Sequence, residues 1–186
     1  MSIADTWGRK LGLVHHITSR VAHWSGVYTS FARVPWADTR RVIYVCDGNI
    51  CRSAYGVARA RSLGLDAESF GVRAAPGVPA DPVAVKTAAR RGIDLRAHRS
   101  ATVETYVPHT GDLLLAMEPR QARELTRRFR GAVPVSLLGL WTQPPRPHIE
   151  DPFGLTPSYF ETCFAIIDAA TQHVRAIVPP LPTTMR

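Results

Sequence analysis

Two side chains that could carry out phosphoryl chemistry, Cys46 and Arg52, lie in the segment 42–53, which reads VIYVCDGNICRS. A thiolate is a strong nucleophile, and a helix N-terminus or a nearby cation lowers the pKa of a thiol from its usual value of about 8.5. A guanidinium presents a planar fork of donors that matches two oxygens of a phosphoryl group. The pair therefore predicts covalent attack of sulfur on phosphorus, with Arg52 holding the oxygens. Ser53 is expected to hydrogen-bond the sulfur and ease its departure.

The residues around this pair predict the element that positions them. The apolar, β-branched run Val42–Val45 indicates a buried strand, and a helix is expected to begin at Ser53. A strand, a short turn and a helix aim backbone N–H groups and the positive end of the helix dipole at one point. Gly48 and Asn49 tolerate the unusual dihedral angles of such a turn. The expected phosphate-binding residues are Gly48, Asn49, Ile50, Cys51, Arg52 and Ser53.

The motif Cys46-Asp-Gly-Asn-Ile-Cys-Arg-Ser53 resembles the signature of low-molecular-weight protein tyrosine phosphatases, and is most similar to the bacterial, exopolysaccharide-associated type. The resemblance extends to about Ala170 and includes Asp151-Pro-Phe153. It implies that Asp151 is the general acid, which protonates the leaving oxygen and later activates water. It also implies that Phe153 forms a pocket wall suited to stacking on a phenyl ring. No metal and no other cofactor is implied.

The resemblance also implies a set of supporting residues. Asn49 would hold the shape of the loop through hydrogen bonds, with Ser69 and His98 as its partners. The substrate pocket would include Asp47, Ala75 and Phe153. Asp47 places a carboxylate close to an anion site, so we expect it to point outward, and the small Ala75 predicts an open pocket.

The three cysteines have different expected roles. In the resembling family, a pair such as Cys46 and Cys51 can close to a reversible disulfide that protects the nucleophile from over-oxidation. The alternative for Cys51 is a small apolar filler. Cys163 lies on the apolar face of the expected last helix and is predicted to be inert.

The predicted function is hydrolysis of phosphotyrosine in proteins through a phosphocysteine intermediate, acting on a tyrosine kinase or its targets in exopolysaccharide control. Thioredoxin-coupled arsenate reductases share this loop but need two further cysteines, and residues 79–99 contain none. A second alternative is a non-catalytic phosphate-loop module that binds through its basic surface. Family members acting on phosphoarginine tend to carry Thr where this chain has Ile50, which favours phosphotyrosine.

The composition of the chain constrains its number of domains, its partners and its location. A chain of 186 residues with 45% hydrophobic content fits one globular domain. The formal net charge of +8 favours anionic partners, of which we expect phosphoesters and acidic lipids but no nucleic acid. An odd number of cysteines fits a reducing compartment. Neither a membrane span nor a secretory signal is evident, so a cytoplasmic location is expected.

Strand and helix patterns alternate along the chain and predict an α/β fold. Strands are expected near 42–45, 68–72, 112–117 and 133–138, and helices near 53–63, 81–91, 119–128 and 158–177. This order predicts a single doubly wound domain, a four-stranded parallel sheet in the flavodoxin-like order 2-1-3-4 with helices on both faces. Ligands of such sheets bind beyond the carboxyl ends of the strands, where the Cys46 loop lies. The candidate acid lies in a long, Pro-rich loop, 141–157.

Three segments are expected: an N-terminal extension (1–40), the phosphatase domain (41–178) and a Pro-rich tail (179–186). Apolar residues at helical spacing predict an amphipathic helix over residues 5–32, with Asp5 as a possible cap. These residues are Trp7, Leu11, Val14, Ile17, Val21, Trp24, Tyr28 and Phe31. The apolar stripe could pack on the domain or on a second copy, contact an anionic membrane surface at the inner membrane, or belong to a transit peptide.

Overall fold

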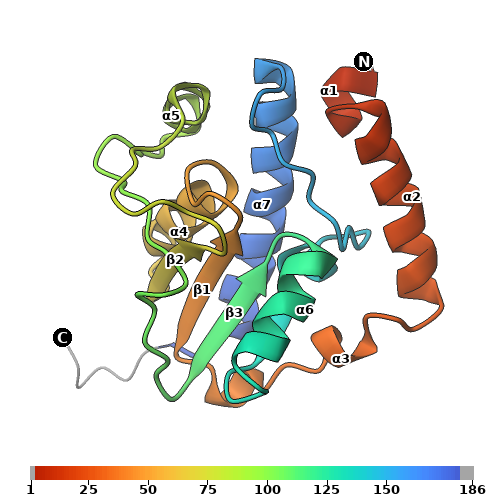
Figure 1. Cartoon of the computed structure of the whole chain (residues 1–186), viewed down its shortest axis with the longest axis vertical. Coiled ribbons are helices and arrows are strands. Elements are labelled where there is room, and N and C mark those ends of the chain that lie inside the picture. The colour runs from red at the N-terminus through yellow and green to blue at the C-terminus, as the bar shows by residue number, and fades with distance from the viewer. Residues whose placement is uncertain (1–2, 181–186) are drawn as a thin grey trace.

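The core of the computed structural model, which describes residues 3–180, is a four-stranded sheet. Its strands are β1 (Arg41–Cys46), β2 (Ala67–Gly71), β3 (Asp112–Ala116) and β4 (Val135–Leu137). All neighbouring strands are parallel, in the order β2-β1-β3-β4. Figure 1 shows β2, β1 and β3 side by side. The predicted doubly wound α/β fold and its strand order are therefore confirmed. Residues 181–186 of the predicted Pro-rich tail lie outside the described residues.

Helices cover both faces of the sheet, which is why its strands read as continuous apolar runs. On one face lie α4 (Arg52–Ser62), α5 (Pro82–Arg90) and α7 (Pro157–Ile177), and on the other lies α6 (Pro119–Arg128). Side chains of β1 alternate between two apolar clusters, with Tyr44 in the α4–α7 cluster and Val45 in the α6 cluster. Two short 3₁₀ helices, at Trp36–Asp38 and Leu138–Trp141, complete the connections.

Close packing fixes α4 against the strand that carries the nucleophile. Gly56 lies directly against Tyr44, so that a Cβ at this position would come within 2.4 Å of the tyrosine ring. The Tyr44 side chain is fully buried and donates a hydrogen bond of 3.1 Å to Thr171 of α7. Because β1 and α4 flank the Cys46 loop, this packing sets the distance between the two ends of the loop.

The N-terminal extension contains helices but is not one continuous helix over residues 5–32. The structure has α1 (Ile3–Trp7), α2 (Lys10–Trp24) and α3 (Thr29–Ala32). Gly8 and Gly26 separate them with φ angles of +74° and +79°. Glycine adopts this left-handed conformation without steric cost, so both glycines end the preceding helix. Asp5 lies in the first turn of α1 and is not its cap.

The apolar stripe of α2 faces solvent, so the expectation that it packs on the phosphatase domain is wrong for this helix. Its large side chains are 51–73% exposed; they are Leu11, Val14, Ile17, Val21 and Trp24. The buried positions of α2 are Gly12 and Ser19, on the side that faces the domain. Further along, Tyr28 and Phe31 are buried in the α6 cluster and anchor the extension there. Among the described residues, no helix has the length and apolarity that crossing a bilayer requires.

Candidate active site

The Cys46 loop lies at the carboxyl end of β1, as the topology requires of a ligand site in this class of fold. Cys46 is the last residue of β1, and α4 begins at Arg52. The Cys46 thiol lies 3.0 Å from the Ser53 hydroxyl. Ser53 Oγ already accepts a hydrogen bond from Asn49, so its own O–H is free to donate to the sulfur. The structure thus brings the two ends of the loop together, as the sequence motif predicts.

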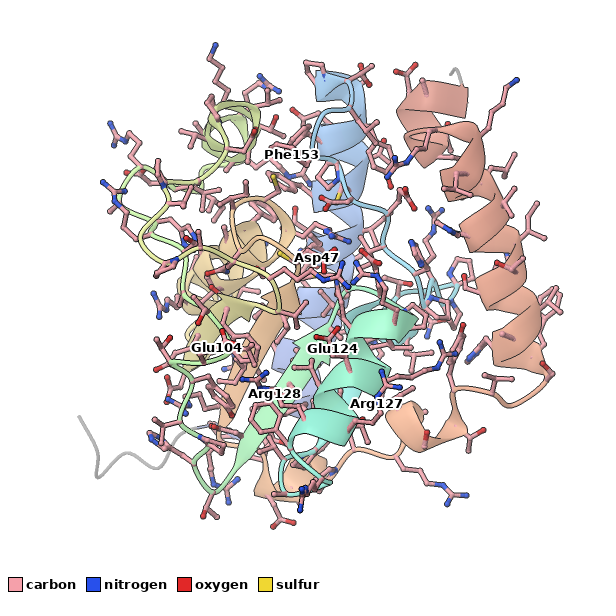
Figure 2. All side chains as sticks on the ribbon, viewed as in Figure 1. Asp47, Glu104, Glu124, Arg127, Arg128 and Phe153 are labelled. Atoms are coloured by element: carbon pink, nitrogen blue, oxygen red, sulfur yellow. The ribbon has the colours of Figure 1, made fainter. Side chains whose placement is uncertain are left out.

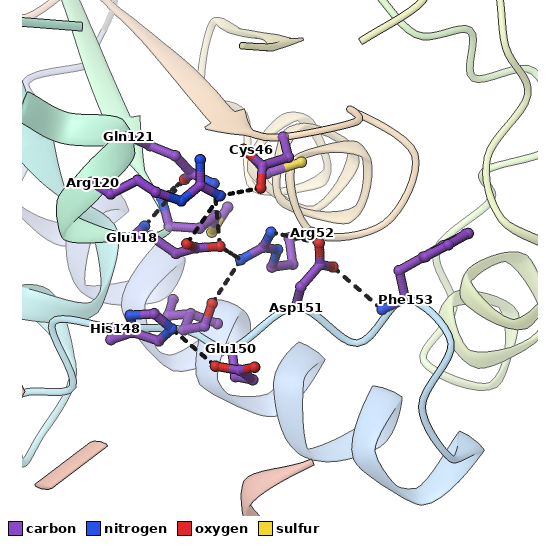
Figure 3. Close-up of polar contacts among 12 residues, drawn as sticks. Cys46, Arg52, Glu118, Arg120, Gln121, His148, Glu150, Asp151 and Phe153 are labelled. Atoms are coloured by element: carbon purple, nitrogen blue, oxygen red, sulfur yellow. Dashed lines mark hydrogen bonds and ion pairs between the residues drawn. The ribbon is translucent and has the colours of Figure 1, made fainter. Parts of the chain in front are cut away.

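Arg52 is completely buried, and only part of its guanidinium is satisfied. Nη1 donates to Glu118 Oε1 (2.6 Å) and to the carbonyl of Ile149 (2.8 Å) (Figure 3). Nε and Nη2 have no hydrogen-bond partner among the described residues, although Nη2 lies 2.9 Å from Asp151 Oδ2 as an ion pair. Leaving a buried donor unpaired costs about 1–3 kcal/mol. The free edge of this fork is therefore suited to an oxyanion.

The turn of the loop depends on the backbone of Asn49, which has a φ angle of +52°. Its side-chain amide donates to Ser53 Oγ (2.8 Å) and to Ser69 Oγ (2.9 Å), and its Oδ1 accepts from the Ala101 N–H (2.8 Å). The Asn49 carbonyl accepts from His98 Nε2 at 2.7 Å. The residues expected to support the loop are thus in contact with it. Burial lowers the pKa of His98, which favours the neutral form of this imidazole.

Electrostatics at the nucleophile differ from the expectation of a depressed thiol pKa. Burial raises the pKa of Cys46 above its ordinary value, and the opposing effects of Arg52 and Ser53 are smaller. The charge of Arg52 is shared with Glu118 and Asp151, which reduces its influence on the sulfur. Burial would lower the pKa of Arg52, but these carboxylates raise it, so the guanidinium remains charged.

A cavity of about 230 Å³ opens over the loop. It is lined by Cys46, Asp47, Gly48, Ile50, Cys51, Asp151 and Phe153. Asp47 and Phe153 both lie toward the end of the sheet where β1 ends (Figure 2). Phe153 is 60% exposed, which leaves one aromatic face available at the pocket mouth. Asp47 forms an ion pair with Arg120, which holds its carboxylate at the rim.

One of the predicted pocket residues lies elsewhere, and the three cysteines are free thiols. Ala75 does not line the cavity; it is exposed, and its carbonyl accepts a hydrogen bond from Ser100. Cys46 and Cys51 are free thiols, so the disulfide stays a prediction. Burial raises the pKa of Cys51, consistent with an apolar filler in this state. Cys163 lies in α7 and is buried in the apolar core, as expected.

Three functional residues escaped the sequence reasoning. Glu118 fixes Arg52, Gln121 closes a capping box with Glu118 at the start of α6, and Arg120 pairs with Asp47. A signal was present: Glu118 follows β3, whose carboxyl end lies beside that of β1 in a parallel sheet. A buried acidic residue at that edge faces the same site as the Cys46 loop.

A thiol and a buried guanidinium at the ends of one strand-to-helix loop, with a carboxyl above them, define a phosphatase site of the cysteine-nucleophile class. A sequence profile described as low molecular weight phosphotyrosine protein phosphatase matches residues 41–178. The chain belongs to the low molecular weight phosphotyrosine protein phosphatase family.

Individual proteins show the same relationship. The chain is 34% identical over 145 residues to a probable low molecular weight protein-tyrosine-phosphatase, EpsP of Ralstonia solanacearum, covering 74% of this chain and 98% of EpsP. It resembles the structure of the Erwinia amylovora tyrosine phosphatase AmsI with a TM-score of 0.68 at 26% identity, covering 78% and 98% of the two chains. The YwlE arginine phosphatase of Geobacillus stearothermophilus is also similar, with a TM-score of 0.65 at 25% identity, covering 74% and 91%. The proteins of similar fold thus include both tyrosine phosphatases and arginine phosphatases.

Proposed function

We propose that this enzyme hydrolyses phosphotyrosine in proteins, with Cys46 as nucleophile, Arg52 as phosphate clamp and Asp151 as general acid. In the first step the Cys46 thiol gives its proton to an oxygen of the bound phosphoryl group and the resulting thiolate attacks phosphorus. The bond to the tyrosyl oxygen breaks, while that oxygen takes a proton from Asp151. In the second step water attacks phosphorus, Asp151 takes a proton from this water, and the bond to sulfur breaks. Nε and Nη2 of Arg52 carry the proposal, because they have no hydrogen-bond partner among the described residues and are donors for two phosphoryl oxygens, which would displace Asp151 from Nη2.

The pocket supports a tyrosyl rather than an arginyl leaving group. Ile50 and Phe153 present apolar surface at the cavity, which suits a phenyl ring. Asp47 is an acidic residue at the rim; its Oδ2 is paired with Arg120, and its Oδ1 is buried without a hydrogen-bond partner among the described residues. A phosphoarginine side chain would therefore compete with Arg120 for this carboxylate.

Turnover of three substrates tests this proposal: p-nitrophenyl phosphate, a phosphotyrosine peptide and the matching phosphoarginine peptide. We expect activity on the first two, no detectable turnover for Cys46→Ser, and a kcat about 10²–10⁴-fold lower for Asp151→Asn. Asp94→Asn, which changes an exposed carboxylate that is paired with Arg96 and does not line the cavity, is the matched control for Asp151→Asn and should keep its activity. Preferential hydrolysis of phosphoarginine, or an active Cys46→Ser variant, would overturn the proposal.

The cellular substrate that we propose is a tyrosine kinase, or the targets of one, in the control of exopolysaccharide export. The family resemblance supports this partner, and the exposed Phe153 and the long loop that carries Asp151 provide a surface for a protein substrate. Phosphoproteomics of a deletion strain tests it, with a strain expressing Cys46→Ser as the control. Unchanged tyrosine phosphorylation on the kinase and its targets would contradict this assignment.

We propose further that α2 docks the enzyme on the anionic inner surface of the cytoplasmic membrane. Its exposed apolar stripe lies beside cationic groups, because Lys10 is exposed and the Arg20 guanidinium lies 5.1 Å from the centre of the Trp24 ring. Residues 1–40 carry five Lys/Arg against two Asp/Glu, a net charge of +3. Buried apolar area and attraction to anionic lipids together determine the binding of such interfacial helices.

Co-sedimentation with vesicles tests this location. We expect the wild type to bind phosphatidylglycerol-containing vesicles and not phosphatidylcholine vesicles, and the triple variant Leu11→Gln/Ile17→Gln/Trp24→Gln to lose at least 10-fold of that binding. Val107→Gln removes an equally exposed apolar side chain outside the extension and should bind like the wild type. Failure of the wild type to bind, or a stripe-dependent dimer in size-exclusion chromatography without vesicle binding, would overturn the proposal.

A further inference from the structure

Glu150, the residue before Asp151, connects the acid loop to the N-terminal extension. Its side chain is only 6% exposed. Arg9 Nε donates to Oε1 at 2.7 Å, while His15 Nδ1 (2.8 Å) and His148 Nε2 (3.0 Å) donate to Oε2. Arg9 is the N-cap residue of α2 and His15 lies within this helix, which precedes the region 41–178 that matches the family. Two separate parts of the chain thus meet on one buried carboxylate.

The surrounding contacts hold the extension against the same loop. Gly8, between α1 and α2, lies directly against Leu155 of the acid loop, because a Cβ at this position would come within 2.6 Å of Leu155 Cδ1. The Thr162 hydroxyl of α7 donates to the Asp5 carbonyl at 2.7 Å. The Trp7 ring lies 5.6 Å from the Arg146 guanidinium. The extension therefore contacts both the beginning and the end of the segment 146–155.

The charge balance of the cluster favours a permanent ion pair. Burial would raise the pKa of Glu150, but the hydrogen bonds from His148, His15 and Arg9 lower it to about 2. The carboxylate is therefore ionised throughout the pH range in which such an enzyme is assayed. His15, His148 and Glu150 place three potential ligand atoms within 4.8 Å of one another. Arg9 pairs with the other oxygen of this carboxylate, so the charge of Glu150 is balanced by a residue of the extension.

Three consecutive residues of the acid loop are anchored to different partners. The Ile149 carbonyl accepts from Arg52, and the Ile149 N–H donates to the Met117 carbonyl at 2.9 Å. Glu150 points toward the extension, while Asp151 points toward Arg52 (Figure 3). Movement of Glu150 would therefore move the backbone that carries Asp151. A displacement of 1 Å at a reacting group can cost about 10²-fold in rate.

We infer that Arg9 and His15 are positioning residues, which hold Asp151 at the donating position by fixing Glu150. This inference rests on the proposed role of Asp151 as general acid. Loss of the two contacts would leave the nucleophile and the phosphate clamp in place but would reduce the fraction of molecules with a correctly placed acid. The defect should therefore depend on how much the leaving group needs a proton.

The test compares kcat/KM for phenyl phosphate and 2,4-dinitrophenyl phosphate in the full chain. The phenolate leaving group needs protonation, whereas dinitrophenolate leaves readily without it. We expect Arg9→Gln/His15→Ala to lower kcat/KM about 10-fold for phenyl phosphate and less than about 2-fold for dinitrophenyl phosphate. Arg9→Lys should recover part of the loss. The control is His23→Gln near the C-terminal end of the same helix, since His23 has no hydrogen bond to Glu150 among the described residues.

The Asp151→Asn background separates the two hypotheses. If Asp151 is the acid, this change alone has the larger effect on phenyl phosphate, and adding Arg9→Gln/His15→Ala causes no further selective loss. An Asp151→Asn variant with equal losses on both substrates would refute the proposed function. Two outcomes would overturn the positioning role if Asp151→Asn lowers kcat/KM selectively for phenyl phosphate. One is an Arg9→Gln/His15→Ala variant with the kcat/KM values of the wild type. The other is a double variant in which kcat/KM falls equally for both substrates and the melting temperature falls as well.

Discussion

Replacement of Asn49 by Ala should remove the hydrogen bonds that support the phosphate loop. The resulting loss of unfolding free energy can be worked out from the contacts of Asn49. The change removes the two bonds from Nδ2 to Ser53 and Ser69 and the bond from the Ala101 N–H to Oδ1. At about 1 kcal/mol net for each hydrogen bond, their loss amounts to roughly 3 kcal/mol. Alanine at a φ of +52° adds about 1 kcal/mol, because Cβ disfavours the left-handed region that Asn tolerates.

The total of roughly 4 kcal/mol is a large part of the 5–15 kcal/mol that stabilises a typical domain. Asn49→Gly is the matched variant: it loses the same hydrogen bonds but adopts a positive φ freely, so its loss should be smaller by roughly 1 kcal/mol. Urea unfolding followed by tryptophan fluorescence measures both free energies by linear extrapolation. A loss below about 1 kcal/mol for Asn49→Ala would refute the hydrogen-bond accounting, and equal losses in the two variants would refute the backbone contribution.

Three further changes test the charges of the site. Arg52→Lys keeps the charge but loses the planar fork, so kcat for p-nitrophenyl phosphate should fall about 10²–10³-fold in steady-state assays, and a near-normal kcat would argue against bidentate binding. Asp151→Asn removes an anion that raises the pKa of Cys46, so the pH midpoint of alkylation by iodoacetamide should move downward; an unchanged midpoint would show that the carboxylate does not influence the thiol. Glu150 has its pKa lowered from 4.5 to about 2, so it stabilises the fold above pH 4.5 and loses this contribution as the pH falls toward 2. Glu150→Gln should therefore weaken the fall in unfolding free energy between pH 5 and pH 3, measured with urea, relative to the wild type.

Local signals in the sequence predicted most of the fold. Helix α5 begins where Asp81 precedes Pro82, and the Asp81 carboxylate indeed accepts from the backbone N–H groups of Val83 and Ala84. Helix α6 has the expected bounds, Pro119–Arg128, because proline fixes its first turn. Such elements depend on residues only a few positions apart, and the Cys46–Ser53 contact is of the same kind.

Contacts between distant segments could not be read in this way. Arg9 and Glu150 are separated by 141 residues, and no periodicity in the extension indicates an acidic partner in the acid loop. The stripe of α2 was identified by its spacing, but spacing alone does not say whether a face meets protein or solvent. The buried side of α2 consists of small residues such as Gly12, which lies against Glu150 and allows the close approach that a larger side chain would prevent.

The pKa of Cys46 depends on burial, which the loop motif alone does not reveal. A guanidinium beside a thiol predicts a low pKa when considered alone, but here burial of the sulfur raises the pKa more than Arg52 lowers it, and the Asp151 carboxylate raises it further. Glu118 and Asp151 both pair with Arg52. Glu118 holds Nη1, which the proposed reaction does not need, whereas Asp151 lies on the edge that a phosphoryl group would occupy. In the proposed reaction the phosphoryl oxygens replace Asp151 at Nη2, which frees its carboxyl from the guanidinium. Substrate binding would thus release the acid from Arg52 to face the leaving oxygen, while Glu150 keeps the backbone of the loop in place.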